Sequence, residues 1–385
     1  MRMKKIVYVM KSFAVKAGVE RVMSDKMNYL AGQGYEVVMV TYEQGQHPDA
    51  FPLHPAIRHL DLGVPFFPIM KYGLLKRLPK IRRLRQLFKA RLQALLDAEQ
   101  PDVLIVSTCS IKLMDIVLSA KTRARKMIES HAPCYAVKKS VYYQDRPLLR
   151  MLAVLYDKWM LGQAAKAYLL VTLTEGDARE WRSYIPRIEV IPNPVTKYPD
   201  AVKPHDGSGH RIICAGRLNK EKRFDLLIDA FARIAADCPE WTVDIFGEGA
   251  DRPMLLDRIA RYGLADRIII HEPTSDIYSE YQDSEFYVLS SLYEGFGLVL
   301  VEAMSCGIPC VAFRCKYGPE DIIADRQDGL LVEDGNVVAL ADAMLWMIRH
   351  PEERLRMGKA AREAVARYQK PVVMQRWMDL FEKSE

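Results

Sequence analysis

The sequence predicts an α/β protein of two Rossmann-like domains, each built from parallel strands that alternate with helices. Its 385 residues are many for one domain, and half of them are hydrophobic, which is enough for two cores. An apolar strand at 5–10, a helix at 18–31 and a strand at 35–41 form a β-loop-α-β unit of the parallel type. Three prolines between 192 and 199 cannot occupy a central strand or a helix interior, so a domain boundary falls there.

The remaining elements follow from the same hydrophobic periodicities. In the first domain, strands are predicted at 103–107, 126–130, 169–174 and 188–191, and a helix at 80–96. In the second domain, strands are predicted at 211–215, 241–246, 266–271, 286–289 and 308–312, with helices at 224–237, 297–306, 336–349, 351–367 and 371–383. We therefore expect domains at 1–192 and 208–370, joined by a hinge at 193–207.

Residues 284–312, SEFYVLSSLYEGFGLVLVEAMSCGIPCVA, hold the most informative pattern. The order of strand, loop, helix and strand places the loop at the carboxyl edge of a doubly wound sheet, where ligands bind. The backbone N–H groups near Phe296, Gly297 and Leu298 would point outward at the start of the helix, which favours a phosphate. Glu294 and Glu302 flank this anion site, and a carboxylate beside a diphosphate is costly unless it binds hydroxyl groups. The stretch therefore indicates a polyhydroxylated ligand such as a sugar nucleotide.

The segment EGFGLVLVEAMSCGIPCVA, which starts at Glu294 and contains Glu302, closely resembles the motif of glycosyltransferase family 4. The resemblance covers residues 1–383 and is strongest from 211 to 335. Members of this family are retaining enzymes of the GT-B fold. The resemblance therefore implies two Rossmann-like domains that face a central cleft, with a C-terminal helix at 371–385 that crosses back to the first domain. It also implies that the first domain binds the acceptor and the second binds the nucleotide sugar.

The resemblance assigns catalytic roles to individual positions. Arg217 and Lys222 match an arginine and a lysine that hold the donor diphosphate in the family, and their charges suit a leaving group that becomes negative. His131 follows a predicted strand and matches a histidine that reaches the transferred sugar; the alternative is a purely structural histidine. Glu294 is expected to bind hydroxyl groups of the donor sugar.

Further positions are assigned to donor binding by the same resemblance. They are Gly18 in the AGVER turn, Gly216, Gly247, Pro273, Thr274, Phe296, Gly297, Leu298 and Glu302, of which the last is expected to bind the nucleotide ribose. Two departures from the family pattern occur: Ala17 replaces a glycine beside Gly18, and Arg223 stands where glycine is frequent. For Gly18, a plain strand-to-helix turn is the alternative.

Nothing in the sequence points to a metal site. Asp-x-Asp does not occur, and no spaced His/Cys cluster is found. We therefore expect no metal and no cofactor, and we expect Arg217, Lys222 and the N–H groups at the helix start to stabilise the departing diphosphate.

Residues 71–91 are basic and amphipathic. They contain nine Lys and Arg residues, and no acid occurs between Asp61 and Asp97. Apolar residues recur at helical spacing: Leu78, Ile81, Leu84, Leu87, Phe88, Leu92, Leu95 and Leu96. Together with the aromatic segment 65–72, this fits a helix on an anionic membrane, each basic residue adding about 1 kcal/mol. A solvated basic face on a core helix is the alternative. A nucleic-acid site fits poorly because no nucleic-acid motif accompanies the leucines.

Charge is unevenly divided along the chain. Residues 1–196 contain 31 Lys and Arg against 17 Asp and Glu, whereas residues 197–385 contain 24 against 32. This asymmetry suggests that the first domain meets an anionic surface. Neither a leader peptide nor an apolar segment of about 20 residues is found, and the seven cysteines form no CxxC pair. We therefore expect a cytoplasmic protein, peripherally associated with the inner face of the membrane.

Together these features predict a metal-independent, retaining hexosyltransferase that closes about its hinge. The donor is a nucleotide sugar, with UDP preferred from family frequency alone. The acceptor is a lipid-linked or growing surface glycan, as in polysaccharide, lipopolysaccharide or capsule assembly. One alternative is a soluble glycosyltransferase that makes a small glycoside or a storage polymer. Another is a non-catalytic GT-B protein that binds nucleotide sugars.

Overall fold

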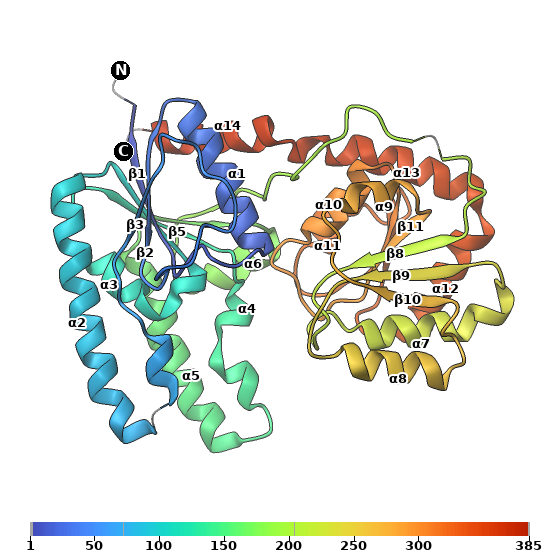
Figure 1. Cartoon of the computed structure of the whole chain (residues 1–385), viewed down its shortest axis with the longest axis horizontal. Helices are drawn as coiled ribbons and strands as arrows, with labels where there is room; N and C mark the ends of the chain where they lie inside the picture. Colours follow the sequence, from blue (N-terminus) through green and yellow to red (C-terminus); the bar gives the residue numbers. More distant parts are fainter. Residues whose placement is uncertain (1–2, 72, 204, 384–385) are drawn as a thin grey trace. The chain divides into compact units, whose positions relative to one another are not determined.

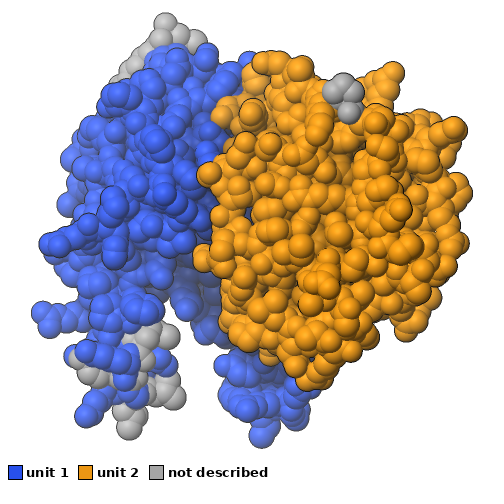
Figure 2. All heavy atoms as spheres, turned by 45° about the vertical axis from the view of Figure 1, so that its right-hand side comes forward, with its two compact units in different colours: residues 1–192, 374–385 blue, residues 193–373 orange. Residues whose placement is uncertain are grey.

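The computed structural model describes residues 3–71, 73–203 and 205–383, without the side chains of Met70, Leu74 and Leu75. The chain divides into two compact units (Figure 2). Unit 1 comprises residues 1–192 and 374–385, and unit 2 comprises residues 193–373. The last two residues of the predicted helix at 371–385 lie outside the described part, as does Tyr72 of the aromatic segment.

Unit 1 is built on a parallel sheet with the strand order β3-β2-β1-β4-β5-β6-β7 (Figure 1). Its strands are β1 (Lys5–Val9), β2 (Glu36–Thr41), β3 (Arg58–Asp61), β4 (Val103–Ser107), β5 (Arg125–Glu129), β6 (Leu169–Thr172) and β7 (Ile188–Val190). Its helices are α1 (Gly18–Gly32), α2 (Leu74–Glu99), α3 (Met114–Ser119), α4 (Cys134–Val137), α5 (Pro147–Gly162) and α6 (Glu175–Trp181), with 3-10 turns η1 (Phe67–Lys71), η2 (Thr108–Leu113), η3 (Lys139–Tyr143) and η4 (Gln163–Lys166).

Unit 2 repeats this architecture with the strand order β10-β9-β8-β11-β12-β13. Its strands are β8 (Arg211–Ala215), β9 (Thr242–Phe246), β10 (Ile268–His271), β11 (Phe286–Leu289), β12 (Cys310–Phe313) and β13 (Gly329–Val332). Its helices are α7 (Phe224–Ile234), α8 (Arg252–Arg261), α9 (Ile277–Gln282), α10 (Leu298–Ser305), α11 (Pro319–Ile322), α12 (Val337–Arg349) and α13 (Pro351–Val365), with 3-10 turns η5 (Ala235–Asp237) and η6 (Ala366–Tyr368). Helix α14 (Lys370–Glu382) ends the chain.

The central strands read as continuous apolar runs because helices cover both faces of each sheet. Every residue of β4 is buried, and so is every residue of β11 and β12. In unit 1 the strand order reverses at β1, which lies between β2 and β4; in unit 2 it reverses at β8, which lies between β9 and β11. Ligands of doubly wound sheets bind at such a reversal, outside the carboxyl ends of the strands. The predicted fold class is confirmed.

Helix α14 returns to unit 1 through contacts of its C-terminal half. The Tyr35 hydroxyl donates to Glu382 over 3.0 Å, and the Arg376 guanidinium donates to the carbonyl of Val190 over 2.5 Å. Trp377 and Phe381 are almost fully buried. The predicted C-terminal helix thus contributes to the core of unit 1.

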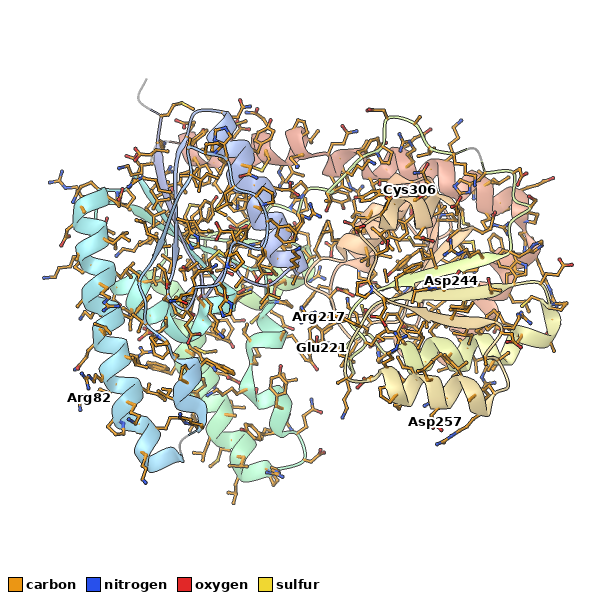
Figure 3. The ribbon with its side chains drawn as sticks, in the orientation of Figure 1. Arg82, Arg217, Glu221, Asp244, Asp257 and Cys306 are labelled. Atoms are coloured by element: carbon orange, nitrogen blue, oxygen red, sulfur yellow. The ribbon has the colours of Figure 1, made fainter. Side chains whose placement is uncertain are left out.

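Helix α2 differs from the predicted surface helix. It begins at Leu74, six residues before the predicted start. Its apolar stripe faces the core of unit 1, where Phe88, Leu92 and Leu96 are fully buried. The exposed side is basic, and Arg82 points away from the unit (Figure 3). Most of the stripe is therefore packed against protein, and what α2 offers to a membrane is charge.

Several elements of unit 1 were not predicted, and for β3 and α5 the sequence gives a physical reason. Strand β3 has the sequence RHLD, which lacks an apolar alternation because it pairs with β2 alone at the sheet edge. Helix α5 carries apolar residues on both faces, so the face that packs on the core does not stand out in the sequence. Among the described residues, none of the helices is long and apolar enough to cross a membrane.

Candidate active site

The loops that follow β8 and β11 meet at the strand-order reversal of unit 2. The carbonyl of Glu221 accepts from the Leu292 N–H over 2.7 Å, and the carbonyl of Lys222 accepts from the Ser290 hydroxyl over 2.8 Å. Backbone and side-chain hydrogen bonds thus join residues 221–222 to residues 290–292. The edge predicted from the sequence to bind a ligand is therefore a single, well-connected surface.

Glu294 and Lys222 form an ion pair at the centre of this surface. Lys222 Nζ lies 2.6 Å from Glu294 Oε1, and the Ser291 hydroxyl donates to the same oxygen over 2.6 Å. Glu294 is 9% exposed, so the carboxylate is largely removed from water. The structure thus brings together two of the four predicted catalytic residues. It adds Ser291, which sequence reasoning did not single out.

Arg217 and Arg223 belong to the same loop but differ in their surroundings. Arg217 is exposed (Figure 3). Arg223 has a left-handed backbone with φ of 46°, a conformation that glycine adopts most readily. Its guanidinium donates to the Ser291 carbonyl over 2.7 Å and pairs with Asp334. These contacts explain how an arginine occupies a position where glycine is frequent in the family: the side chain clamps the two loops.

Helix α10 opens at Gly297, whose φ of 96° lies in the left-handed region. A second turn packs closely here, since a Cβ on Gly318 would stand 2.0 Å from the carbonyl oxygen of Phe296. The helix thus begins one residue later than predicted, at Leu298. The predicted role of this helix start in binding phosphate stays a prediction.

Glu302 is held by a different set of contacts from Glu294. Its carboxylate accepts from the Thr196 hydroxyl over 2.9 Å. Burial and the charge of Glu302 raise the pKa of the Tyr278 hydroxyl, which in turn accepts from the Lys197 N–H over 2.9 Å. Thr196, which no sequence pattern marked, therefore positions Glu302. Pro273 and Thr274 lie in an exposed turn after β10, and the Thr274 hydroxyl accepts from the Asp276 N–H over 3.1 Å.

Glycines 216 and 247 allow two backbone turns to touch. A Cβ on Gly247 would lie 1.9 Å from the Gly216 carbonyl oxygen, and one on Gly249 would lie 2.2 Å from the Leu218 carbonyl oxygen. The Leu218 N–H donates to the Glu248 carbonyl over 2.8 Å, which fixes the second turn against the first. Close backbone packing accounts for these glycines, and their predicted contact with the donor stays a prediction.

We expect Gly247→Ala to lower the free energy of unfolding by about 1–3 kcal/mol or more, because the added methyl group forces the two turns apart. Gly18→Ala is the matched control. A Cβ at Gly18, the first residue of α1, meets no described atom within 4 Å, so stability should be unchanged or slightly raised. Urea unfolding of both variants checks this. Equal stability of the two variants would contradict the packing account.

In unit 1, His131 belongs to a buried ionic cluster at the carboxyl end of β5. His131 Nε2 lies 3.1 Å from Glu129 Oε1, and Lys26 Nζ lies 2.7 Å from Glu129 Oε2. All three side chains are at most 2% exposed. The Lys26 ammonium also stands 3.0 Å from the ring centre of Trp377 and 5.4 Å from that of Tyr8. The cluster therefore ties α1, β5 and α14 together.

Burial and the contacts within this cluster shift the pKa values of its side chains. Burial lowers the pKa of Lys26, and the Glu129 carboxylate offsets part of this, leaving about 8. Burial alone would raise the pKa of Glu129, but the charges of Lys26 and His131 and their hydrogen bonds lower it to about 2. Burial and Glu129 also raise the pKa of Tyr8. Around neutral pH the ionised form of Glu129 is thus strongly favoured, and it fixes the His131 imidazole.

Asp177 anchors the segment that carries His131. Its carboxylate accepts from the Ser130 hydroxyl and from the Cys134 N–H, both over 2.7 Å. Burial raises the pKa of this carboxyl group to about 6, although these hydrogen bonds act in the opposite direction. Sequence reasoning missed Lys26, Glu129 and Asp177. A signal existed for the first two: Lys26 falls on the apolar face of α1, and Glu129 directly follows the two apolar residues of β5.

Comparisons with known proteins agree with this architecture. The family model described as Glycosyltransferase Family 4 matches residues 17–197, and the model described as Glycosyl transferases group 1 matches residues 200–364. An uncharacterized glycosyltransferase of Haemophilus influenzae is 27% identical over 379 residues, covering 97% of this chain and 99% of that protein. The amylovoran biosynthesis glycosyltransferase AmsD of Erwinia amylovora is 23% identical over 389 residues, covering 98% and 99%.

Among solved structures, a variant of TarM from S. aureus, in complex with Fondaparinux, α-GlcNAc-glycerol and UDP, superposes with a TM-score of 0.78. It is 18% identical, and the match covers 99% of this chain and 100% of TarM. The two parallel Rossmann-like sheets and this structural match define a protein of the GT-B class. The chain belongs to the group 1 glycosyltransferases, with a family 4 N-terminal domain. The family predicted from the segment 294–312 is therefore confirmed.

Proposed function

We propose that this chain transfers a hexosyl group, with retention of configuration, from a nucleotide sugar to a lipid-linked or growing surface glycan. The observation that carries the proposal is the partly buried contact of Lys222 with Glu294 at the strand-order reversal of unit 2. A cation and a carboxylate held together there match the two chemical demands of a sugar nucleotide, which are neutralisation of the diphosphate and recognition of hydroxyl groups.

When the donor binds, the contact between Lys222 and Glu294 is replaced by contacts of each side chain with the donor. The diphosphate draws Lys222 Nζ away from Glu294, and exposed Arg217 adds a guanidinium with bidentate geometry. Glu294, still held by Ser291, then accepts hydrogen bonds from sugar hydroxyls. Glu302 binds the ribose. The contact of His131 with the sugar stays a prediction, because its imidazole is 1% exposed and its Nε2 lies against Glu129. The leaving phosphate takes the proton of the acceptor hydroxyl as that oxygen attacks from the same face.

The relatives support the choice of substrates. AmsD is named for amylovoran biosynthesis, and the TarM structure contains UDP and α-GlcNAc-glycerol. We therefore propose a UDP-sugar as donor and a glycan-building reaction. The charge excess of residues 1–196 suits an acceptor that is presented at an anionic membrane.

The side chains around the diphosphate also suit a reaction without metal. Because Lys222 and Arg217 supply the positive charge, EDTA should leave the rate of UDP release from UDP-sugars unchanged within about twofold, whereas Lys222→Met should lower it by ~10²–10³-fold. Lys359→Met is the matched control, since Lys359 is an exposed lysine of α13. Loss of turnover in EDTA with recovery on adding Mg²⁺ would contradict the proposed electrostatics.

A further inference from the structure

Helix α5 presents a row of large apolar side chains to solvent. Leu148, Met151, Leu152, Leu155 and Trp159, which we call the α5 stripe, are spaced at i, i+3, i+4, i+7 and i+11 and share one face. They are 75%, 56%, 59%, 60% and 53% exposed. Tyr142 and Tyr143, just before the helix, are exposed as well. Contiguous apolar patches of this kind mark interaction surfaces in soluble proteins.

The stripe faces outward because the opposite face of α5 is firmly anchored. Ala153, Met160 and Leu161 are buried in unit 1. The buried Asp157 carboxylate accepts from the N–H groups of Lys139 and Ser140, each over 2.9 Å. The helix is thus fixed on one side by core packing and by a side-chain cap on the preceding turn. The stripe cannot rotate inward without breaking these contacts.

Positive charge surrounds the stripe. On and beside α5, Arg146, Arg150 and Lys158 are exposed, with Asp145 as the exposed acid. Helix α2 adds Lys76, Lys80, Arg82, Arg83 and Lys89, all exposed, together with Leu78 at 61%. Exposed Phe67 precedes α2 in η1.

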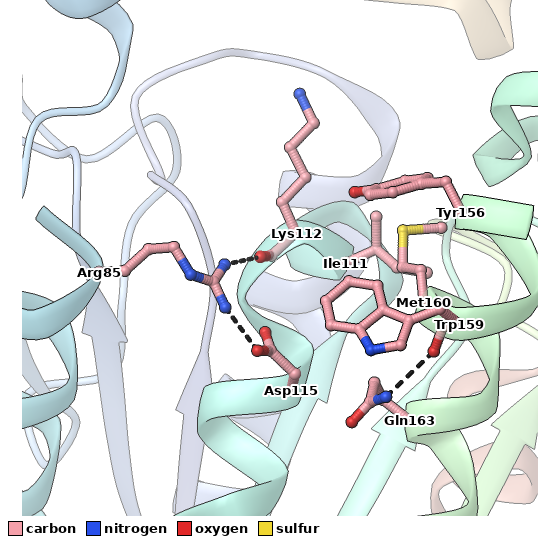
Figure 4. Close-up of a pocket in the computed structure, with 8 residues that line it drawn as sticks. All are labelled: Arg85, Ile111, Lys112, Asp115, Tyr156, Trp159, Met160 and Gln163. Atoms are coloured by element: carbon pink, nitrogen blue, oxygen red, sulfur yellow. Dashed lines mark hydrogen bonds and ion pairs between the residues drawn. The ribbon is translucent and has the colours of Figure 1, made fainter. Parts of the chain in front are cut away.

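The two helices border one hollow. Arg85 of α2 and Tyr156, Trp159 and Met160 of α5 line it together (Figure 4). Arg85 donates to the Lys112 carbonyl and pairs with Asp115 of α3, which holds the wall between the helices. The N-terminal ends of α2 and α5 lie on the same side of unit 1 (Figure 1). The basic side chains of α2 and the α5 stripe therefore belong to one region of the surface.

We propose that the α5 stripe inserts into the headgroup region of an anionic lipid bilayer, while the basic side chains of α2 bind the lipid phosphates. Leucine, methionine and terminal tryptophan flanked by Arg and Lys have the composition of an interfacial helix. The local excess of positive charge is complementary to anionic lipid, whereas a neutral protein partner would gain nothing from it. The proposal rests on the proposed function only in so far as a lipid-linked acceptor would be found at the membrane. It differs from the sequence prediction because α5, and not α2, is the helix that inserts.

Flotation with acceptor-free vesicles tests the proposal. The full chain should float with phosphatidylcholine vesicles containing about one-third phosphatidylglycerol, and far less with phosphatidylcholine alone. The triple variant Leu148→Ser, Leu152→Ser, Leu155→Ser should partition at least ~10-fold less into the anionic vesicles. Arg82→Ala, Arg83→Ala, Lys89→Ala should have a similar effect that shrinks as salt rises. The control Met254→Ser, Leu256→Ser changes exposed apolar residues of α8 in unit 2 and should float as the parent does.

Tryptophan fluorescence provides a second readout. Of the five tryptophans, Trp159 is 53% exposed, whereas Trp181, Trp241 and Trp377 are buried and Trp346 is partly buried. Brominated lipid should quench the parent and leave Trp159→Phe unquenched. Undiminished flotation of the serine variant would overturn the proposal. So would a parent dimer that the serine substitutions convert to monomer. Nucleotide binding by unit 2 should be unaffected, so failure of docking and failure of the proposed function are distinguishable.

Discussion

Replacing Glu294 with glutamine should lower kcat by ~10²–10³-fold while nucleoside diphosphate binding is retained. The amide keeps the size of the side chain and its contact with Ser291, but it removes the charge that pairs with Lys222 over 2.6 Å. Glutamine also donates where the carboxylate accepts, so one sugar hydroxyl loses its acceptor. Release of the nucleotide from a UDP-sugar, measured with and without acceptor, gives kcat and KM.

Glu352→Gln serves as the control for this experiment, because Glu352 is an exposed glutamate of α13 in the same unit. It should leave both constants near their parent values. If Glu294→Gln instead raised KM and left kcat unchanged, the carboxylate would stabilise the bound substrate and the transition state equally. Its proposed catalytic role would then be wrong.

Removing the charge of Glu129 should destabilise the protein by about 3–5 kcal/mol, the usual cost of leaving one charge of a buried pair alone. In Glu129→Gln the Lys26 ammonium remains between Tyr8 and Trp377 without its counterion, 1% exposed. The double variant Lys26→Met, Glu129→Gln removes both charges and should recover most of the loss. Chemical denaturation of the parent, the single variant and the double variant measures the coupling.

The pH dependence of stability follows from the same pair. The pKa of Glu129 is about 2 in the folded state and 4.5 for a free side chain, so its contribution is complete above 4.5 and is lost as pH falls from 4.5 to 2. The pKa of Lys26 is lowered to about 8 from 10.5, so the unfolded chain binds more protons between these values and stability rises with pH there. Glu129→Gln should abolish the acid-side loss. An unchanged acid transition would mean that other carboxylates whose pKa is lowered by a partner, such as Glu99 beside Arg58 and Asp229 beside Arg258, dominate it.

The sequence anticipated those parts of the fold that depend on local pattern. Strands β4, β8 and β11 begin and end at the predicted residues, because fully buried parallel strands read as short apolar runs. The sequence also predicted that Lys222 and Glu294 lie at the same edge of the sheet. This followed from topology alone, because the loops after β8 and β11 both lie at the carboxyl edge. The two residues are 72 positions apart in the sequence, and their contact could not be read from either loop.

What the sequence did not reveal depends on long-range packing. Lys26 is buried because Glu129 and Trp377, distant in the chain, compensate its charge. The sequence predicted that the helix at 80–96 lies on a membrane, because its leucines recur at helical spacing and basic residues lie between them. The core of unit 1 covers those leucines, and only the folded structure shows that. Conversely, α5 carries apolar residues on both faces, and burial alone tells which face is left outside.

The central claim is that Lys222 and Arg217 bind the diphosphate of the donor. The most direct test compares the affinity of the tightest-binding nucleoside diphosphate among UDP, GDP and ADP with that of its nucleoside, by calorimetry in EDTA. The parent should bind the diphosphate at least ~10²-fold more tightly, and Lys222→Met, Arg217→Met should reduce this preference to a few-fold, since two charge-assisted contacts are lost. A preference that survives in the double variant would show that the diphosphate binds elsewhere, and the proposed site would be wrong.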